Sequence, residues 1–384
     1  MTKRWGSIAA LGLAIAAGGA TAFQLAPMGS RFEARLTNET PNWLAAVAGK
    51  VGVLLKEPVH EEITQLAYGC PIDPSGLPTD KGCMGGDHGF ANHFVIYGVR
   101  WNDLPPFMLQ PGEGARCKKV LNPLANACNV GQTVRFSTQP DCWYCLFKEA
   151  QEKAARVKIT GCQKGLGHSR GNLMTRSHFG DLQFLHAMAN EEAVPPEVTR
   201  QKIIEWAEFT WKIAEGKIKP GTQLRTINIP VIQEHFGCSE WTVADIYILG
   251  RNPQLLPYVQ QIAFGSLLHT VQDSFAAGHA QREESAPGGI CPASDFPHPP
   301  RLIEFHGYAQ QDGHAHDRQD AREALVGNGS SDWPAAVAAT RHLVTLRDAG
   351  LSWEQVKPAV ECLFALVPEA RPSGPGEMFT RVPS

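Results

Sequence analysis

Apolar side chains recur three and four positions apart along much of this 384-residue chain, the spacing that puts them on one face of an α-helix. Helices are expected at 58–69, 196–215, 241–249, 257–277, 333–347 and 352–366, with 177–186 leading into the middle ones. Few segments alternate with the period of a strand, and no internal repeat stands out. We therefore predict a mainly α fold with a helical bundle as its core.

Two of these elements carry polar residues at fixed positions. In 58–69, Pro58 in the first turn, acidic residues beside it and Gly69 at the end are typical start and stop signals, and His60 lies at the edge of the apolar stripe. An apolar segment over 94–102 ends in Asp103, directly before a Leu-Pro-Pro sequence. Asp103 is therefore expected to be held at a fixed turn.

The N-terminus has the pattern of a targeting segment. Lys3 and Arg4 precede an apolar stretch over 8–17, and Ala20-Thr21-Ala22 resembles a cleavage site, so 1–22 is predicted to be a signal peptide. The apolar stretch is short for a membrane span. Export predicts a secreted or periplasmic protein. The net charge of -3 gives no basic surplus for binding duplex nucleic acid by bulk electrostatics.

Ten cysteines in an exported chain predict disulfides. Five of them lie in the least regular part, 106–171, which we interpret as a disulfide-rich insertion over one face of a single α-helical domain, 23–384. Cys142 and Cys145 have the spacing of a redox pair or half a zinc site, but no strand-helix-strand pattern surrounds them and disulfides are favoured.

The central predicted helix contains His269 and Asp273, four residues apart and therefore on one face. His279 follows after Ala277-Gly278, where the helix is expected to end, so that it can turn back toward Asp273. Gly265, one turn before His269, is expected to leave room for ligands from elsewhere in the fold. The pattern predicts a metal site in a helical core.

A second pair, His316 and Asp320, repeats the spacing of four residues. Two such pairs together with His279 indicate more than one metal. Imidazole and carboxylate ligands without thiolate favour zinc, with manganese or iron as alternatives.

With these motifs the chain resembles the superfamily of zinc-dependent phospholipases C and single-strand-specific secreted nucleases. The resemblance rests on His269, Asp273 and His279 at the family's spacing and a later pair of histidine and acid. His60, Asp103 and His178 support it in the family's order. It implies the family's helical fold and one zinc held by Asp103, His178, His269 and Asp273. It also implies a second zinc held by His279, His316 and Asp320, and a third that involves His60 and Asp273.

The chain departs from the family in two places. The third zinc of the family also uses an N-terminal tryptophan, and no tryptophan lies between Phe23 and Asn42. The usual proline between the aspartate and the third histidine is missing. Several ligand assignments stay open: His186 for His178, and His306 or His314 with Asp317 for His316. The cluster Asp87, His88 and His93 is a minor candidate for the third site. Asp181 is expected to accept a hydrogen bond from a ligating histidine.

Clustered divalent ions supply hydroxide near neutral pH and neutralise charge on the attacking and leaving oxygens of a phosphodiester. Asp273 is expected to bridge two metals and Asp103 to orient the attacking water.

The leading hypothesis is an exported zinc-dependent phosphodiesterase of the phospholipase C type, with two or three zinc ions. A single-strand nuclease with 3'-nucleotidase action is the alternative, so the substrate is a phospholipid or single-stranded nucleic acid. Peripheral membrane contact is possible only through the catalytic domain or the insertion, and no protein partner is inferred. A non-catalytic exported metal- or ligand-binding protein is the alternative of another class.

Overall fold

The structure, a computed structural model, describes most of the helical part of the chain. It describes residues 59–70, 90–109, 114, 117, 128–131, 133–136, 139–154, 156–162, 172–249, 253–292, 294–308, 311–312, 315–316 and 333–380. The predicted signal peptide 1–22 lies outside the described residues. So do the predicted ligand Asp320 and the alternatives Asp87, His88, His314 and Asp317.

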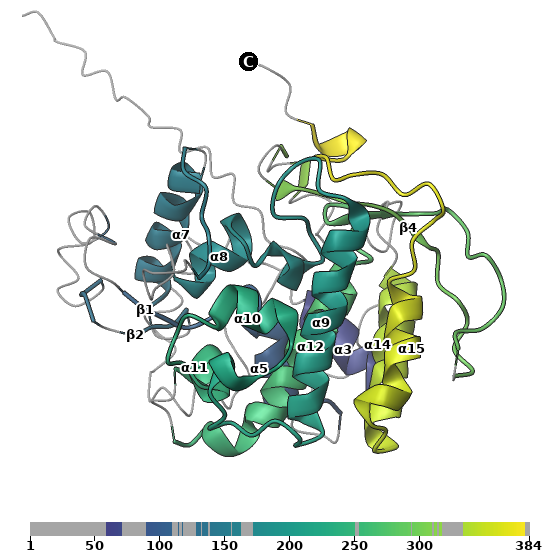
Figure 1. Cartoon of the computed structure of the whole chain (residues 1–384), viewed down its shortest axis with the longest axis horizontal. Helices are drawn as coiled ribbons and strands as arrows, with labels where there is room; N and C mark the ends of the chain where they lie inside the picture. The colour runs from purple at the N-terminus through teal and green to yellow at the C-terminus, as the bar shows by residue number, and fades with distance from the viewer. Residues whose placement is uncertain are drawn as a thin grey trace, which may run out of the picture.

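The described residues are mainly α-helical, as predicted (Figure 1). The α-helices are α3 (Val59–Ala67), α5 (His93–Trp101), α7 (Pro140–Ala154), α8 (Leu173–Phe179), α9 (Pro196–Ala214), α10 (Pro230–Phe236), α11 (Val243–Ile248), α12 (Val259–Asp273), α14 (Trp333–Asp348) and α15 (Trp353–Leu363). Short 3-10 helices are η2 (Gln183–His186), η3 (Leu224–Thr226), η4 (Leu256–Tyr258) and η7 (Glu377–Phe379). Strand β1 (Phe107–Met108) pairs antiparallel with β2 (Thr133–Val134), and β3 (Ala280–Arg282) pairs antiparallel with β4 (Leu302–Phe305).

Helix α12 is the centre of the fold. It packs against α5 and α9 most extensively and also against α3, α11 and α14 (Figure 1). Val259 and every residue from Ile262 to Asp273 are buried. Neighbouring helices cover α12 on several sides, so polar residues such as Ser266, Thr270 and Gln272 are buried together with the apolar ones.

Two glycines allow α5 and α12 to pack backbone against backbone. A Cβ atom on Gly265 would collide with the carbonyl oxygen of Val95, and one on Gly98 would collide with the carbonyl oxygen of Ile262. The space that the sequence predicted around Gly265 therefore admits the backbone of α5, not the side chain of a ligand. The close approach brings the end of α5, where Asp103 lies, beside the face of α12 that carries His269.

The segment 106–171, predicted to be an irregular insertion, is more regular than expected where the structure describes it. It contains the 15-residue helix α7 and the β1–β2 pair, which enclose a small apolar cluster of their own. Disulfides join Cys117 to Cys145 and Cys128 to Cys142, so the two cysteines of the Cys-x-x-Cys sequence have different partners. The prediction of disulfides is confirmed. The helix was missed although Pro140 starts it and Trp143, Phe147 and Ala150 recur at helical spacing.

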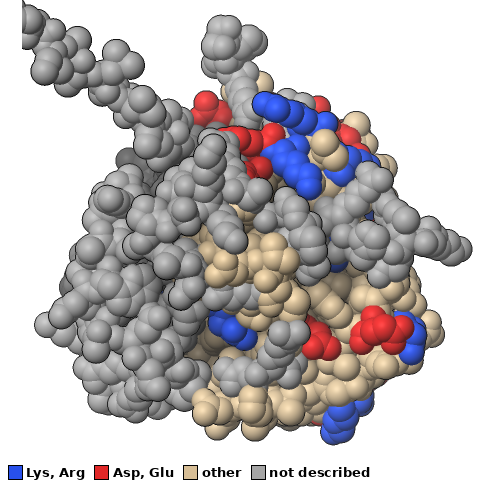
Figure 2. All heavy atoms as spheres, turned by 90° about the vertical axis from the view of Figure 1, so that its left-hand side faces the viewer, with Lys and Arg blue, Asp and Glu red and all other residues tan. Residues whose placement is uncertain are grey.

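Two further disulfides tie segments that are distant in sequence. Cys162 is joined to Cys238 after α10, and Cys291 is joined to Cys362 in α15. No helix among the described residues is long and apolar enough to cross a membrane. On the face drawn in Figure 2, the described basic and acidic side chains lie next to one another, and neither sign forms a separate field there.

Candidate metal centre

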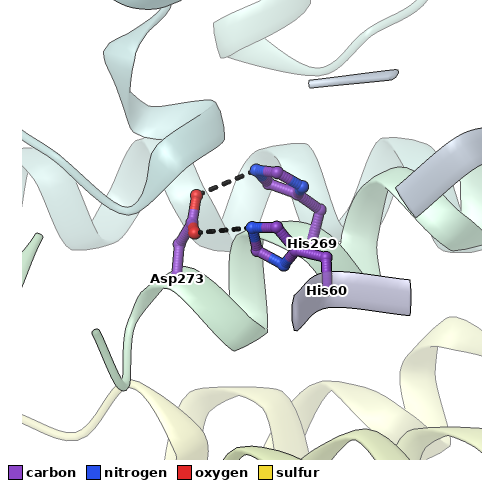
Figure 3. Close-up of side chains that lie close together, drawn as sticks. All are labelled: His60, His269 and Asp273. Atoms are coloured by element: carbon purple, nitrogen blue, oxygen red, sulfur yellow. Dashed lines mark ion pairs between the residues drawn. The ribbon is translucent and has the colours of Figure 1, made fainter. Parts of the chain in front are cut away.

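Helix α12 presents His269 and Asp273 to a histidine from α3 (Figure 3). Nε2 of His269 lies 2.9 Å from Oδ2 of Asp273, and Nε2 of His60 lies 3.2 Å from Oδ1 of the same carboxylate. The two imidazole rings stack with their centroids 3.9 Å apart. None of the three side chains is exposed. These residues form one group whose ligand atoms are close enough to hold a metal ion.

A second group shares His269 and adds Asp103 and His186. Nδ1 of His186, at the end of η2, lies 3.0 Å from Oδ2 of Asp273, 3.2 Å from Nε2 of His269 and 3.6 Å from Oδ1 of Asp103. Three of these atoms, one each from His186, His269 and Asp273, form a triangle with sides of 2.9, 3.0 and 3.2 Å. Ligand atoms about 2.0–2.1 Å from a tetrahedral zinc ion stand roughly 3.3 Å apart, so these three atoms lie slightly closer together than the ligands of a bound zinc ion.

Asn102 holds the elements of this group together. Its side-chain Nδ2 donates to the carbonyl oxygens of Leu185, at 2.7 Å, and Ser266, at 3.2 Å, while its Oδ1 accepts from the Ser266 hydroxyl at 2.6 Å. The buried amide of Asn102 thus joins the end of α5 to η2 and to α12. It places Asp103 and His186, each one residue away from these contacts, beside His269.

Three further histidines surround a small pocket beside the two groups. Nε2 of His178, on α8, lies 3.9 Å from Oδ1 of Asp103, and Nδ1 of His279 lies 3.7 Å from Oδ2 of Asp273. The ring of His316 is 5.0 Å from that of His279 between centroids. The pocket is small, with a volume of about 20 Å³, and is lined by Ser177, His178, Gln183, His186, Met188, His279, Tyr308 and His316.

His279 reaches this pocket because α12 ends at Asp273, four residues earlier than predicted. The chain continues in turns in which the backbone N–H of Ala276 donates to the carbonyl oxygen of Asp273 and that of His279 donates to Ala276. The side chain of His279 is then directed back to η2, where its Nδ1 lies 2.6 Å from the carbonyl oxygen of His186. The predicted return of His279 toward Asp273 is present.

Backbone carbonyl oxygens fix the orientation of several of these imidazoles. Nδ1 of His269 lies 2.6 Å from the carbonyl oxygen of Val99, and Nδ1 of His178 lies 2.9 Å from that of Met174. His279 makes the corresponding contact with His186. A carbonyl oxygen can only accept, so Nδ1 carries the proton and the lone pair is on Nε2. Such support of the second ring nitrogen is typical of histidines that ligate metals. His186 differs, since its Nδ1 faces the cluster.

The electrostatics give neutral imidazoles around an anion. Burial lowers the pKa of His269 and of His186 to about 4, and that of His178 to about 3. Burial alone would raise the pKa of Asp273, but the imidazoles around it, His269 first, outweigh this effect and hold its pKa well below the usual value. Neutral nitrogen lone pairs and buried carboxylate oxygens are the donors that a divalent cation needs.

The structure thus brings most of the predicted ligands to one place. His60, Asp103, His269 and Asp273 are in direct proximity, and His178, His279 and His316 line the adjoining pocket. His186, only an alternative from sequence, lies closer to both carboxylates than His178 does. His306 lines a different cavity, together with Phe275 and Phe379, and does not line the pocket of His316.

Asp181 does not support a ligating histidine as expected. It pairs with Arg176 at 2.7 Å and accepts from Nδ1 of His235 at 2.6 Å, and neither partner belongs to the two metal-binding groups. This buried ion pair joins α8 to α10. Asp181 therefore braces the helix that carries His178 without touching His178 itself.

Comparisons with protein-family models, curated proteins and solved structures found no match to this chain.

Proposed function

We propose that this chain is an exported zinc-dependent phosphodiesterase that hydrolyses its substrate with metal-activated water, as phospholipases C do. The observation that carries the proposal is the arrangement around Asp273. One oxygen of its carboxylate faces His60 at 3.2 Å, and the other faces His269 at 2.9 Å and His186 at 3.0 Å. A carboxylate with nitrogen donors at both oxygens suits a bridge between two cations, and paired cations are suited to phosphodiester hydrolysis.

Zinc is the metal that the donors favour. The donors are imidazole nitrogens and carboxylate oxygens, and none of the described cysteines is free to supply a thiolate. When bound, zinc lowers the pKa of a coordinated water and stabilises negative charge on phosphate oxygens. The same disulfides, together with the N-terminal segment, support a secreted or periplasmic location.

Individual residues have distinct roles in this proposal. Asp273 would hold two metal ions at a fixed separation, since its carboxylate is buried and contacted by imidazoles on both oxygens. Asp103 lies within 3.6–3.9 Å of His186, His178 and His269 and so stands between the cluster and the pocket. Asp103 would ligate metal and orient the attacking water. His178, His279 and His316 line the small pocket beside the cluster and would supply further metal ligands.

A single-strand nuclease is the second candidate, favoured by aromatic side chains at the pocket. Tyr308 lines the pocket and contacts Phe179 with ring centroids 5.7 Å apart, and Phe179 in turn contacts Phe147 at 5.0 Å. Unpaired bases stack on aromatic rings of this kind.

The test is metal content and turnover of the mature protein from residue 23. We expect two or three zinc ions per chain by mass spectrometry and hydrolysis of bis(p-nitrophenyl) phosphate that a chelator abolishes and zinc restores. Phosphatidylcholine vesicles, single-stranded DNA and a 3'-nucleotide then distinguish the two candidate substrates. A folded, zinc-loaded protein that turns over none of these substrates would reject the phosphodiesterase and favour a non-catalytic metal-binding protein.

A further inference from the structure

We propose that two buried glutamines, Gln272 and Gln311, are positioning residues that set the tautomers of His60 and His316 and so make these histidines Nε2 donors to a divalent cation. The inference rests on the metal-binding part of the proposed function and is independent of the substrate. Each glutamine places its amide oxygen 2.7 Å from Nδ1 of its histidine. The orientation of each amide is fixed by its other partners.

Gln272 is fixed by two threonines. Its Nε2 lies 2.9 Å from the hydroxyl of Thr64 and 3.4 Å from that of Thr340. Each hydroxyl has one proton, which Thr64 donates to the carbonyl oxygen of His60 at 2.8 Å and Thr340 donates to that of Ala336 at 2.7 Å. Both hydroxyls can therefore only accept from Gln272. The NH2 group must face the threonines, so the amide oxygen faces His60 and Nδ1 of His60 carries the proton.

Gln311 is fixed by two backbone carbonyl groups. Its Nε2 lies 2.7 Å from the oxygen of Gly278 and 2.8 Å from the oxygen of Pro375. Because carbonyl oxygens only accept, the NH2 group must point to them and the amide oxygen to His316. Nδ1 of His316 is thereby protonated, and the lone pair of this ring is on Nε2.

The consequence at His60 is that its Nε2 is directed at the carboxylate of Asp273. Nε2 of His60 lies 3.2 Å from Oδ1 of Asp273, and neither side chain is exposed. A divalent cation bound here would take both atoms as ligands. His269, His178 and His279 have their tautomers set by backbone carbonyl groups, which no substitution removes. At His60 and His316 the same task falls to side chains, where mutation can test it.

The test compares Gln272→Met and Gln311→Met with the unaltered protein. Chelator competition should show zinc bound about 10–100-fold more weakly in each variant, the usual cost of losing a group that orients a ligating histidine. Gln65→Met is the matched control, because Gln65 is an equally buried amide on the same helix as His60 whose oxygen accepts from the N–H of Ala91.

A second readout needs no metal. In metal-free protein with 15N-labelled histidine, NMR should show His60 and His316 protonated at Nδ1, and Gln272→Met should remove this preference at His60 alone. Unchanged tautomers or unchanged zinc affinity in folded methionine variants would overturn the proposal. A protein that binds zinc with these dependences but hydrolyses nothing would reject the phosphodiesterase and leave the role of the glutamines intact.

Discussion

Nε2 of His60 and Oδ1 of Asp273 lie 3.2 Å apart with both side chains fully buried, which joins α3 to the last residue of α12. The contact is central to the site because the other oxygen of the same carboxylate faces His269 and His186. A single side chain thus connects the two groups of candidate ligands. A substitution that removes the charge of Asp273 but keeps its shape therefore tests this connection.

Asp273→Asn should abolish most zinc binding. Asparagine is nearly isosteric but uncharged and offers only one acceptor oxygen, so it cannot bridge cations. Loss of a ligand should exceed the loss of about 10–100-fold that follows removal of an orienting group, so we expect affinity and phosphodiester turnover to fall by more than about 100-fold. Asp245→Asn is the control, since Asp245 belongs to the capping box of α11. Equal zinc content in both variants would contradict the assignment.

His186 and His178 should differ when each is replaced by glutamine. His186 lies 3.0 Å from Asp273 and 3.6 Å from Asp103, whereas His178 lies 3.9 Å from Asp103. We expect His186→Gln to lower the zinc content per chain and His178→Gln to retain it with slower turnover. Mass spectrometry of the two purified variants decides. Loss of zinc only in His178→Gln would instead support the ligand set that the family resemblance implies.

The sequence was sufficient where a candidate ligand is placed by its own helix. His269 and Asp273 share a face of α12 because of their spacing, and His60 and Asp103 could be selected from the start of one helix and the end of another. His186 could not be ranked above His178, because its position depends on the 3-10 turn η2 and on the hydrogen bonds of Asn102 to Leu185 and Ser266. Such contacts between distant segments leave no periodic signal.

The role of small residues was also beyond sequence reasoning. Gly265 has the same appearance in sequence whether it makes room for a ligand or for another backbone, and only the packing of α5 on α12 distinguishes the two. Helix α7 illustrates a different limit. Its cysteines drew the interpretation toward an irregular insertion, although Trp143 and Phe147 follow a helical period.

Gly265→Ala should destabilise the protein and disturb the metal centre together. The added methyl group would collide with the carbonyl oxygen of Val95, so α5 must move away from α12 and carry Asp103 with it. Overpacking of this kind costs about 1–3 kcal/mol, which differential scanning calorimetry should detect as a lower Tm. Gly221→Ala is the control, because nothing lies within 4 Å of a Cβ atom there. Equal Tm values for the two variants would show that α5 and α12 are packed less tightly than the structure indicates.

Acid should destabilise the metal-free protein at pH values well above the usual pKa range of carboxyl groups. Burial lowers the pKa of His269 and His186 to about 4 and that of His178 to about 3, against about 6.5 in an unfolded chain. Between these values the unfolded chain binds more protons than the folded one, so the free energy of unfolding falls as the pH is lowered from about 6.5 toward 4. Each such histidine contributes at most on the order of 2 kcal/mol between pH 7 and pH 5.

Urea unfolding at pH 7, 6 and 5, with chelator and with zinc, measures this dependence. With zinc bound, the imidazole lone pairs are occupied and protons must displace the metal first, so the loss of stability should begin at lower pH than in the metal-free protein. The carboxyl group of Asp273, whose pKa is held well below its usual value by the surrounding imidazoles against the effect of burial, adds a further loss only at still lower pH. A free energy of unfolding that stays constant from pH 7 to pH 5 without metal would mean that these histidines are accessible to protons in the folded state.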